Sequence, residues 1–344
     1  MQITRSFHRV LVTAALGFSA ACHDSTSPMP AMAFDARHAL QRIDPLAAVL
    51  DQPIFRSFQG ALSSFETFFR STPTAAVIAM PSRGAFDLHL TRSFAPAAQI
   101  RASAIPDGVK GKTFVFDETS RTYVVDPTAT GAPVSGVRFI LYTWDALNGP
   151  TSPLQRIGRV DIFPAEGPGN GSELTEVVVF RETPFLVAAD FITMHQTAGG
   201  VNTFGIEGSA TDGFTVDVVD LNGTESGTTG QHRLVYNTTL SSSPPGTSAV
   251  EQITSDQATA SQSGRLELSY EGHKLTDESV SSGAEVKFDG NLYARVLFAP
   301  TVDDQTQYLK PDGTPLGQQE VADLNAVLER AIVANFFWIS LAFP

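Results

Sequence analysis

The sequence predicts an α+β protein that is mainly β, with an antiparallel sheet, a sandwich or an open barrel packed with N-terminal helices and a C-terminal apolar helix. Apolar residues recur at helical spacings of three and four over residues 34–70 and again over 315–343. From about residue 85 to 300 the apolar pattern has period two, and clusters of Gly, Pro, Asn and Ser separate short runs. Strands joined by short turns, with no helical pattern between them, are typical of antiparallel sheets.

Residues 1–21 predict an export signal. Arg5 and Arg9 form a positive start, Val10–Phe18 is a short apolar run, and Ser19–Ala21 are the small residues that a signal peptidase accepts. The apolar run is shorter than the ~20 residues that a helix needs to cross a bilayer. We therefore expect residues 1–21 to be removed.

The only cysteine of the chain, Cys22, follows this signal directly. The sequence Ser-Ala-Ala-Cys resembles the lipobox of bacterial lipoproteins, although Ser19 stands where that family prefers an aliphatic residue. The resemblance implies that Cys22 becomes the first residue and carries lipid. An ordinary secretory signal, which would leave Cys22 as a free thiol, is the alternative. His23 is not the Asp that marks inner-membrane retention, which favours the outer membrane.

A flexible lipid tether is expected over residues 22–33, because this segment is small, polar and proline-containing. Residues 34–344 are expected to form a single globular domain, and without a second cysteine they have no intramolecular disulfide. The expected location is the bacterial cell envelope, with the protein lipid-anchored at a periplasmic face or the outer membrane.

The composition is acidic and rich in phenylalanine. The chain has 36 Asp and Glu against 23 Lys and Arg, and a formal net charge of -13, which opposes binding to nucleic acid. There are 24 Phe against 6 Tyr and 2 Trp. Phe has no polar group, so this excess indicates dry apolar surface, either in a thick core or around an apolar ligand.

Short helical pieces are expected over residues 34–70. Pro45 and Pro53 each suit the first turn of a helix and would divide the region. One face of the helical segment 51–70 is apolar: Ile54, Phe58, Ala61, Leu62, Phe65 and Phe69.

The strand region, about 85–300, contains two predicted hairpins. "KTFVFDETSRTYVVD" gives strands around a turn at 118–120. In "AEVKFDGNLYARV", a three-residue turn at 289–291 would pair Phe288 with Leu292, Val286 with Ala294, Ala284 with Val296 and Glu285 with Arg295. A polar loop with at most one weak strand is expected near 240–263, which is rich in Ser and Thr.

A C-terminal helix is expected over 315–343, with Thr314 as N-cap and Pro315 in its first turn. Its apolar stripe is Val321, Leu324, Leu328, Ile332, Phe336 and Ile339. Beyond Arg330 nearly every residue is apolar, so we expect this helix to be buried against the sheet. Binding to a membrane surface is the alternative, although the usual basic flank is missing.

The sequence contains no catalytic motif that we recognise. It has no G-x-S-x-G, no H-E-x-x-H, no G-x-G-x-x-G opening a helix and no G-K-[ST]. The histidines are isolated, and the acidic segments at 217–225 and 303–312 lack calcium-loop spacing; the pair Asn222-Gly223 is explained more simply as a turn. We therefore predict no catalytic, cofactor-binding or metal-binding residue; lipid attachment at Cys22 is the single predicted site, and a noncatalytic protein is favoured.

The order of "GAPVSGVRFILYTWD", "VKFDGNLYARV" and "DGTPLGQQEVADL" before a final apolar helix resembles a group of uncharacterised secreted bacterial lipoproteins. The resemblance supports the architecture and implies no activity. Three functions stay open: binding or carrying an apolar ligand between sheet and helices, a structural or protein-binding envelope role, and an exported hydrolase with a dispersed site. The expected partners are the membrane, through lipid on Cys22, and an apolar small molecule or an envelope protein.

Overall fold

The computed structural model describes residues 34–69, 105–145, 149–165, 173–228, 231–244, 246–256, 261–280, 283–298 and 306–342. The expected signal, Cys22 and the expected tether lie outside these residues. So does the beginning of the predicted strand region, residues 85–104. The described residues, from Phe34 onward, belong to one compact unit.

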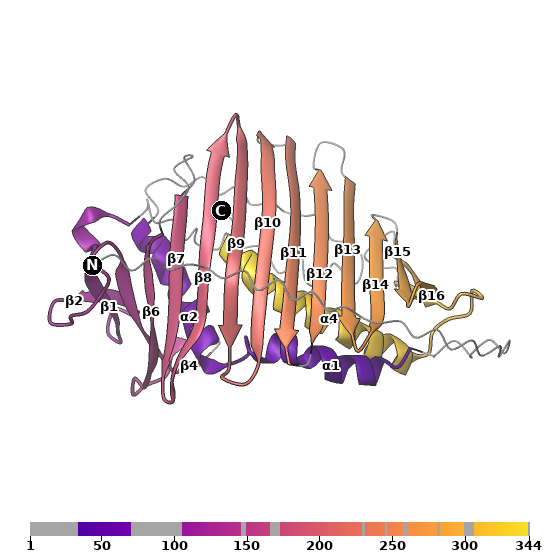
Figure 1. Ribbon diagram of the computed structural model, residues 1–344, viewed down its shortest axis with the longest axis horizontal. Coiled ribbons are helices and arrows are strands. Elements are labelled where there is room, and N and C mark those ends of the chain that lie inside the picture. Colours follow the sequence, from indigo (N-terminus) through magenta and orange to yellow (C-terminus); the bar gives the residue numbers. More distant parts are fainter. Residues whose placement is uncertain are drawn as a thin grey trace, which may run out of the picture. The chain divides into compact units, whose positions relative to one another are not determined.

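A broad antiparallel sheet of 15 strands dominates the described part of the chain (Figure 1). Strands that are consecutive in sequence are neighbours from β6 to β17, and the only parallel pair in this sheet is β1 with β3. In spatial order the strands are β17 (Gln307–Leu309), β16 (Asn291–Leu297), β15 (Gly283–Phe288), β14 (His273–Val280), β13 (Ser261–Tyr270), β12 (Thr247–Asp256), β11 (Gln231–Ser243), β10 (Val216–Thr228), β9 (Val201–Thr211), β8 (Phe185–Ala198), β7 (Glu173–Glu182), β6 (Arg156–Pro164), β3 (Val137–Tyr142), β1 (Lys112–Asp117) and β2 (Thr122–Asp126). A second, two-stranded sheet joins β4 (Trp144–Asp145) to β5 (Gly149–Pro150), and a 3₁₀ turn, η2 (Asp107–Val109), precedes β1. The fold is therefore α+β and mainly β, which confirms the predicted class.

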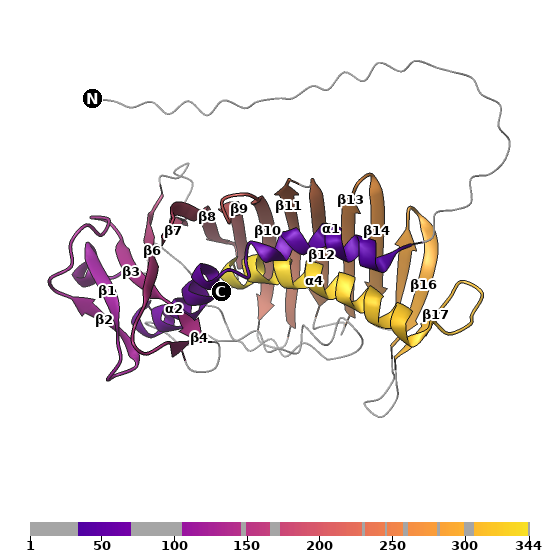
Figure 2. The same ribbon diagram turned by 90° about the horizontal axis from the view of Figure 1, so that it is seen from below.

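Within the described residues, three helices pack on one face of the sheet, which we call the helix-facing side; the other face is the open face (Figure 2). They are α1 (Ala36–Ala48), α2 (Pro53–Phe69) and α4 (Gln318–Ala342). Helices α1 and α4 lie side by side and run in the same direction, because ion pairs join Arg37 to Asp323 (3.7 Å) and Asp44 to Arg330 (2.8 Å) at the same sequence offset. Helix α2 lies against β2, β3, β4 and β6.

The core lies between the helices and the helix-facing side of the sheet. Residues that lie opposite one another on neighbouring strands form a continuous row there. Its apolar members include Val177, Phe191, Val219, Leu240 and Leu268. Each of these side chains is at most 1% exposed. Burying one such side chain stabilises the fold by about 1.5–3 kcal/mol. The sheet and the helices that cover it therefore share one hydrophobic core.

Helix α4 is buried against the sheet, as its composition predicts. The Trp338 ring packs edge-on against Phe191 of β8 with centroids 5.5 Å apart. The helix begins at Gln318 rather than at residue 315, so Thr314 is not its N-cap. Instead the Thr314 N–H and hydroxyl donate to Asp312 in a turn, and the N–H of Gly317 donates to Glu320. Among the described helices, none is long and apolar enough to cross a membrane.

The N-terminal helices agree with the predicted pattern except at one proline. Helix α2 begins at Pro53, and Ile54, Phe58, Ala61 and Leu62 of its predicted stripe are buried. The side chains of the other two stripe residues lie outside the described part. Pro45 lies inside α1 rather than starting a helix. The buried stripe of α1, Ala39, Ile43, Leu46 and Ala47, continues across it, so packing outweighs the backbone hydrogen bond that proline removes.

Both predicted hairpins form, and one differs in its turn. Strands β1 and β2 pair around residues 118–121, and β15 pairs with β16. The predicted pairs of Ala284, Glu285 and Val286 are correct. The turn, however, has two residues, Asp289 and Gly290, both with positive φ. A bulge after Val286 absorbs the difference, so Phe288 faces Asn291.

The polar loop predicted near 240–263 is wrong. Strand β11 continues to Ser243, β12 occupies Thr247–Asp256, and β13 begins at Ser261. Along β12 the buried residues are Thr247, Ala249, Glu251, Ile253 and Ser255, so a period-two pattern exists although most of its members are polar. The neighbouring strands on both sides supply hydrogen-bond partners for the backbone N–H and C=O groups of β12. A hydrophobicity pattern does not reveal such pairing.

The turn expected at Asn222-Gly223 is also wrong, because both residues lie inside β10. Gly223 is needed for its lack of a side chain rather than for a positive φ. A Cβ atom at this position would lie 2.3 Å from the ring of Phe204 on β9, the neighbouring strand. The glycine therefore makes room for an aromatic ring of the core.

Candidate functional site

Three carboxyl groups are buried on the helix-facing side of the sheet without a partner. Asp217 of β10 is 0% exposed, Glu251 of β12 is 3% exposed and Asp277 of β14 is 4% exposed. Both carboxyl oxygens of Asp217, Oε2 of Glu251 and Oδ1 of Asp277 have no hydrogen-bond partner among the residues that the structure describes. Native proteins leave few buried polar groups unsatisfied, so each such group needs an explanation.

Burial changes the protonation of all three groups. It raises the pKa of Glu251 to about 8 and the pKa values of Asp217 and Asp277 to about 7. The charge of Glu278 adds to the effect on Asp277. The hydroxyl of Ser242, opposite Asp217, offsets part of the effect there without meeting hydrogen-bond geometry. Near neutral pH these carboxyls therefore hold protons that exposed carboxyls have lost.

Glu251 has a further unsatisfied group beside it. Thr238 of β11 lies directly opposite Glu251 in the sheet register, is 0% exposed, and has a hydroxyl without a hydrogen-bond partner. Tyr236, two residues along β11, is also buried, and its pKa is raised by burial and by the charge of Glu251. An acceptor and a hydroxyl thus lie next to each other in an apolar interior.

Asp277 shares a row of the sheet with Glu251. Leu266 of β13 lies between them, so their Cα atoms are about 10 Å apart by ordinary strand spacing. On its other side Asp277 influences Tyr308 of β17, whose hydroxyl donates to Asn325 Oδ1 of α4 at 3.1 Å. Glu251, Thr238 and Asp277 are called the interior polar site below.

Two other unsatisfied residues lie on α4. Asn335 is 0% exposed, and neither its amide nitrogen nor its oxygen has a partner among the described residues. The indole nitrogen of Trp338 is likewise buried without an acceptor. The helix that covers the apolar side of the sheet therefore adds its own unsatisfied donors and acceptors. Asp217 is separate from the interior polar site, because it lies two strands and four residues away from Glu251.

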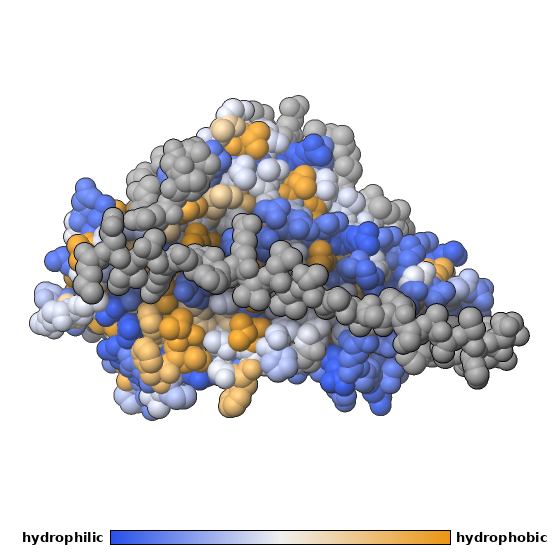
Figure 3. All heavy atoms as spheres, in the orientation of Figure 1, coloured by the Kyte–Doolittle hydropathy of each residue, from blue (hydrophilic) through white to orange (hydrophobic). Residues whose placement is uncertain are grey.

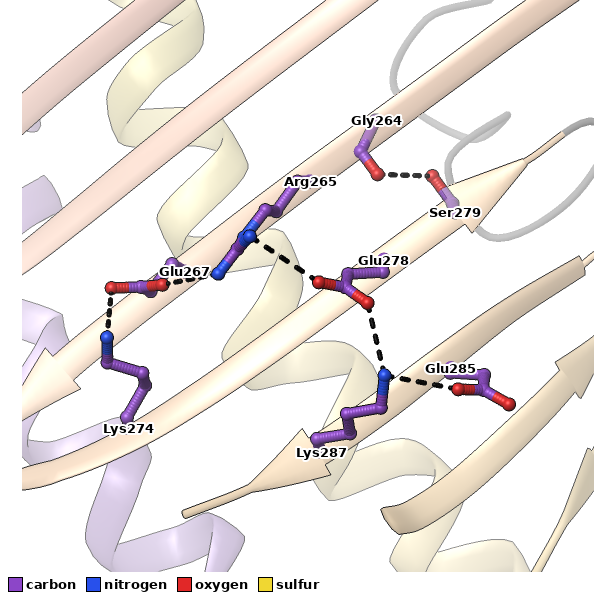
Figure 4. Close-up of polar contacts among 8 residues, drawn as sticks. All are labelled: Gly264, Arg265, Glu267, Lys274, Glu278, Ser279, Glu285 and Lys287. Carbon is purple, nitrogen blue, oxygen red and sulfur yellow. Dashed lines mark hydrogen bonds and ion pairs between the residues drawn. The ribbon is translucent and has the colours of Figure 1, made fainter. Parts of the chain in front are cut away.

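The open face carries a network of exposed ion pairs, the charge ladder (Figure 4). Its members are Arg265, Glu267, Lys274, Glu278, Glu285, Lys287 and Arg295. Lys287 lies 3.1 Å from Glu278 and 3.2 Å from Glu285, while Arg265 lies 3.0 Å from Glu267. Every cation has an acidic partner, so the ladder largely neutralises itself, and pairs of this kind contribute little to stability.

A shallow hollow of about 260 Å³ lies next to the ladder and is lined by Val250, Gln252, Arg265 and Glu267. Figure 3 shows a hydrophilic area over this part of the sheet. The volume is below the 300–1,000 Å³ that is usual for ligand pockets. We interpret the hollow and the ladder as a solvated sheet face.

Apolar side chains are exposed at the ends of two neighbouring hairpins on the same sheet. Phe185, at the turn between β7 and β8, is 67% exposed, and Phe214, at the turn between β9 and β10, is 88% exposed. The two turns are in contact, since Arg181 donates to the carbonyl of Asp212 at 3.2 Å. Exposed apolar side chains that form a large contiguous patch mark surfaces that bind another macromolecule, whereas single ones are common on protein surfaces.

Two histidines pair with carboxylates at strand turns. His38 of α1 lies 2.8 Å from Glu271, and His273 lies 2.9 Å from Asp289. His38 and Glu271 are both about 40% exposed, and Arg42 also binds Glu271, so this pair attaches α1 to the β13–β14 turn. The hydrogen bonds described for the two imidazole rings go to these carboxylates.

Among the described residues, the other histidines and the acidic segments form no metal-binding cluster. His195 is buried in β8, whereas His23, His89 and the side chain of His232 lie outside the described residues. In the segment 217–225, Asp217 and Glu225 are buried on the helix-facing side, while Asp220 and Asn222 are on the open face. Within the described ranges, no group of three or more His, Cys, Asp and Glu residues is arranged to hold a metal ion. Asp303 and Asp304 lie outside the described part.

The sequence patterns described above did not predict the interior polar site. A signal was present for Glu251, which occupies the same strand phase as Ala249 and Ile253. Asp277 similarly lies on the same buried side of β14 as Leu275 and Ser279. A carboxyl group on the apolar side of a predicted strand indicates either that the group is buried or that the predicted register is wrong. Reading residues 240–263 as a loop concealed this signal.

A comparison of the chain with protein-family models, curated proteins and solved structures found no match.

Proposed function

We propose that the protein is exported, anchored in the bacterial cell envelope by lipid on Cys22, and binds or carries an apolar ligand between its sheet and helices. The lipobox resemblance supports the anchor and the location. The observation that supports ligand binding is the set of unsatisfied polar groups inside an apolar interior: Glu251, Thr238, Asp277 and Asn335.

A purely structural core would not favour these residues. Leaving one buried polar group unpaired costs about 1–3 kcal/mol, and a charged group costs more. Replacing Glu251 or Asn335 by an aliphatic residue would remove that cost and fit the apolar surroundings. Their presence is explained if a ligand supplies the missing hydrogen-bond partners, because ligand sites combine apolar walls with a few placed polar groups.

The test is the chemical content of the folded protein. A chain with Cys22→Ala would be exported, purified without detergent and extracted with organic solvent, and the extract would be examined by mass spectrometry. We expect one apolar molecule in stoichiometric amount. An empty extract from protein with intact circular dichroism would contradict ligand carriage.

The second candidate is a noncatalytic envelope protein that binds another protein. The exposed Phe185 and Phe214 at the touching hairpin ends favour it. An empty extract, together with loss of a cross-linked envelope partner on substitution of both residues by Ser, would support this function in place of the first. The two substitutions lie at exposed turns, so we expect the fold to tolerate them.

A further inference from the structure

We propose that the interior polar site binds the cationic head of an apolar amine, with its ammonium group hydrogen-bonded to Glu251 and Thr238 and attracted by Asp277. This inference rests on the proposed function and specifies the chemical class of the ligand.

The unsatisfied groups at this site are two carboxyls and a hydroxyl. The Oε2 atom of Glu251, the Oδ1 atom of Asp277 and the hydroxyl of Thr238 are all buried without a partner. Two of the three groups become anionic acceptors on ionisation, and the threonine hydroxyl also accepts. An ammonium group has three donors and a positive charge, and therefore matches this set.

No described cation is available to neutralise these carboxyls from within the protein. The basic residues of the two covering helices are bound elsewhere. Arg330 of α4 lies 2.8 Å from Asp44 and 2.7 Å from Asp51, on α1 and just after it. Arg37 pairs with Asp323, and Arg42 pairs with Glu271 at a strand turn.

Ligands of other charge fit the site less well. A bound ammonium group favours ionisation of Glu251 and Asp277, whereas a fatty acid carboxylate would oppose it, because like charges at short range repel strongly in an apolar interior. A neutral alcohol could form a hydrogen bond but would leave the carboxyls protonated, without a charge-assisted bond. Charge-assisted hydrogen bonds are roughly twice as strong as neutral ones, so we expect the amine to be preferred.

The groups that surround Glu251 reinforce this preference. Tyr236 of β11 and Tyr308 of β17 are neutral phenols near the site, and Asn325 of α4, bonded to Tyr308, is an uncharged amide. Asp277 of β14 is the nearest further acid in the same row. The local field is therefore negative or neutral, which stabilises a bound cation.

The experiment compares three ligands with the same chain length. Dodecylamine, dodecan-1-ol and dodecanoate would be titrated by calorimetry into the full exported chain carrying Cys22→Ala, at neutral pH and physiological salt. We expect dodecylamine to bind at least tenfold more tightly than dodecan-1-ol, and dodecanoate to bind most weakly. Glu251→Gln should remove the tenfold preference for the amine over the alcohol, and Thr238→Val should reduce that preference by a smaller factor.

A matched control separates the site from the acidic surface. Glu207→Gln is the same substitution at an exposed position on the open face, and should leave all three affinities unchanged. Equal affinity for the amine and the alcohol, or an equal loss in both glutamate variants, would overturn the inference while ligand binding itself stands. If none of the three ligands binds, the inference and the proposed function both fail.

Discussion

Substitution of Glu251 by Gln should stabilise the protein, and the gain should grow with pH. The glutamate is 3% exposed, and burial raises its pKa from 4.5 to about 8. The folded state therefore binds a proton that the unfolded state releases above pH 4.5. By linkage, this residue lowers the free energy of unfolding progressively as pH rises from about 4.5 to about 8, and no further above that.

The size of the effect follows from the shift. One pKa unit corresponds to about 1.4 kcal/mol, so a rise from 4.5 to about 8 gives a difference of about 5 kcal/mol between the two ends of the window. Gln is nearly isosteric and does not titrate. The amide of Gln therefore adds a pH-independent amount to the difference in free energy of unfolding between variant and wild type. Only the glutamate makes that difference change with pH.

Urea unfolding followed by tryptophan fluorescence at pH 5, 7 and 9 measures this difference. We expect the stability gain of Glu251→Gln over wild type to be larger at pH 7 than at pH 5 by about 2–3 kcal/mol, and largest at pH 9. Glu207→Gln, on the open face, should show no such slope. A flat or decreasing difference for Glu251→Gln would refute the reasoning, because it would mean that the carboxylate is ionised and paired in the folded protein.

Three further substitutions test other features. Cys22→Ala should move the protein from the membrane fraction to the soluble fraction, and unchanged fractionation would exclude the lipid anchor. Gly223→Ala should lower the free energy of unfolding by about 1–3 kcal/mol, because its Cβ would lie 2.3 Å from the Phe204 ring, and adding Phe204→Leu should restore part of that loss; full stability of the single variant would contradict this packing. Lys287→Met, which removes the exposed pairs with Glu278 and Glu285, should change stability by less than about 1 kcal/mol in urea unfolding. A larger loss would show that the charge ladder is more than a solvated face.

The predicted features that proved correct depend on local sequence. In the hairpin of β15 and β16, the pairs predicted for Ala284, Glu285 and Val286 are correct. The alternation of polar and apolar residues allows few strand registers that keep one face apolar. Helix α2 begins at Pro53 and buries the four stripe residues whose side chains the structure describes, since the helical period and the fixed φ of proline act within a few residues.

The candidate site could not be predicted in the same way. Glu251 lies in a stretch whose Ser and Thr content is typical of a loop, and it becomes part of a strand because β11 and β13 bind its backbone on both sides. Asp277 is separated from it by 26 positions in the numbering and by a single intervening strand in the sheet. Their common row is a property of the sheet register.

By itself, the sequence determined the mainly antiparallel class, the helical segments at both ends and the expectation of an exported, lipid-anchored chain. The tertiary structure decided that Gly223 lies in a strand, that the Ser- and Thr-rich segment completes the sheet, and that Glu251 and Asp277 share one buried side. The physical reason is the range of the forces involved. Periodicity, turn chemistry and helix starts are set by neighbours in sequence, whereas the burial of a carboxyl depends on strands and helices that are distant in the chain.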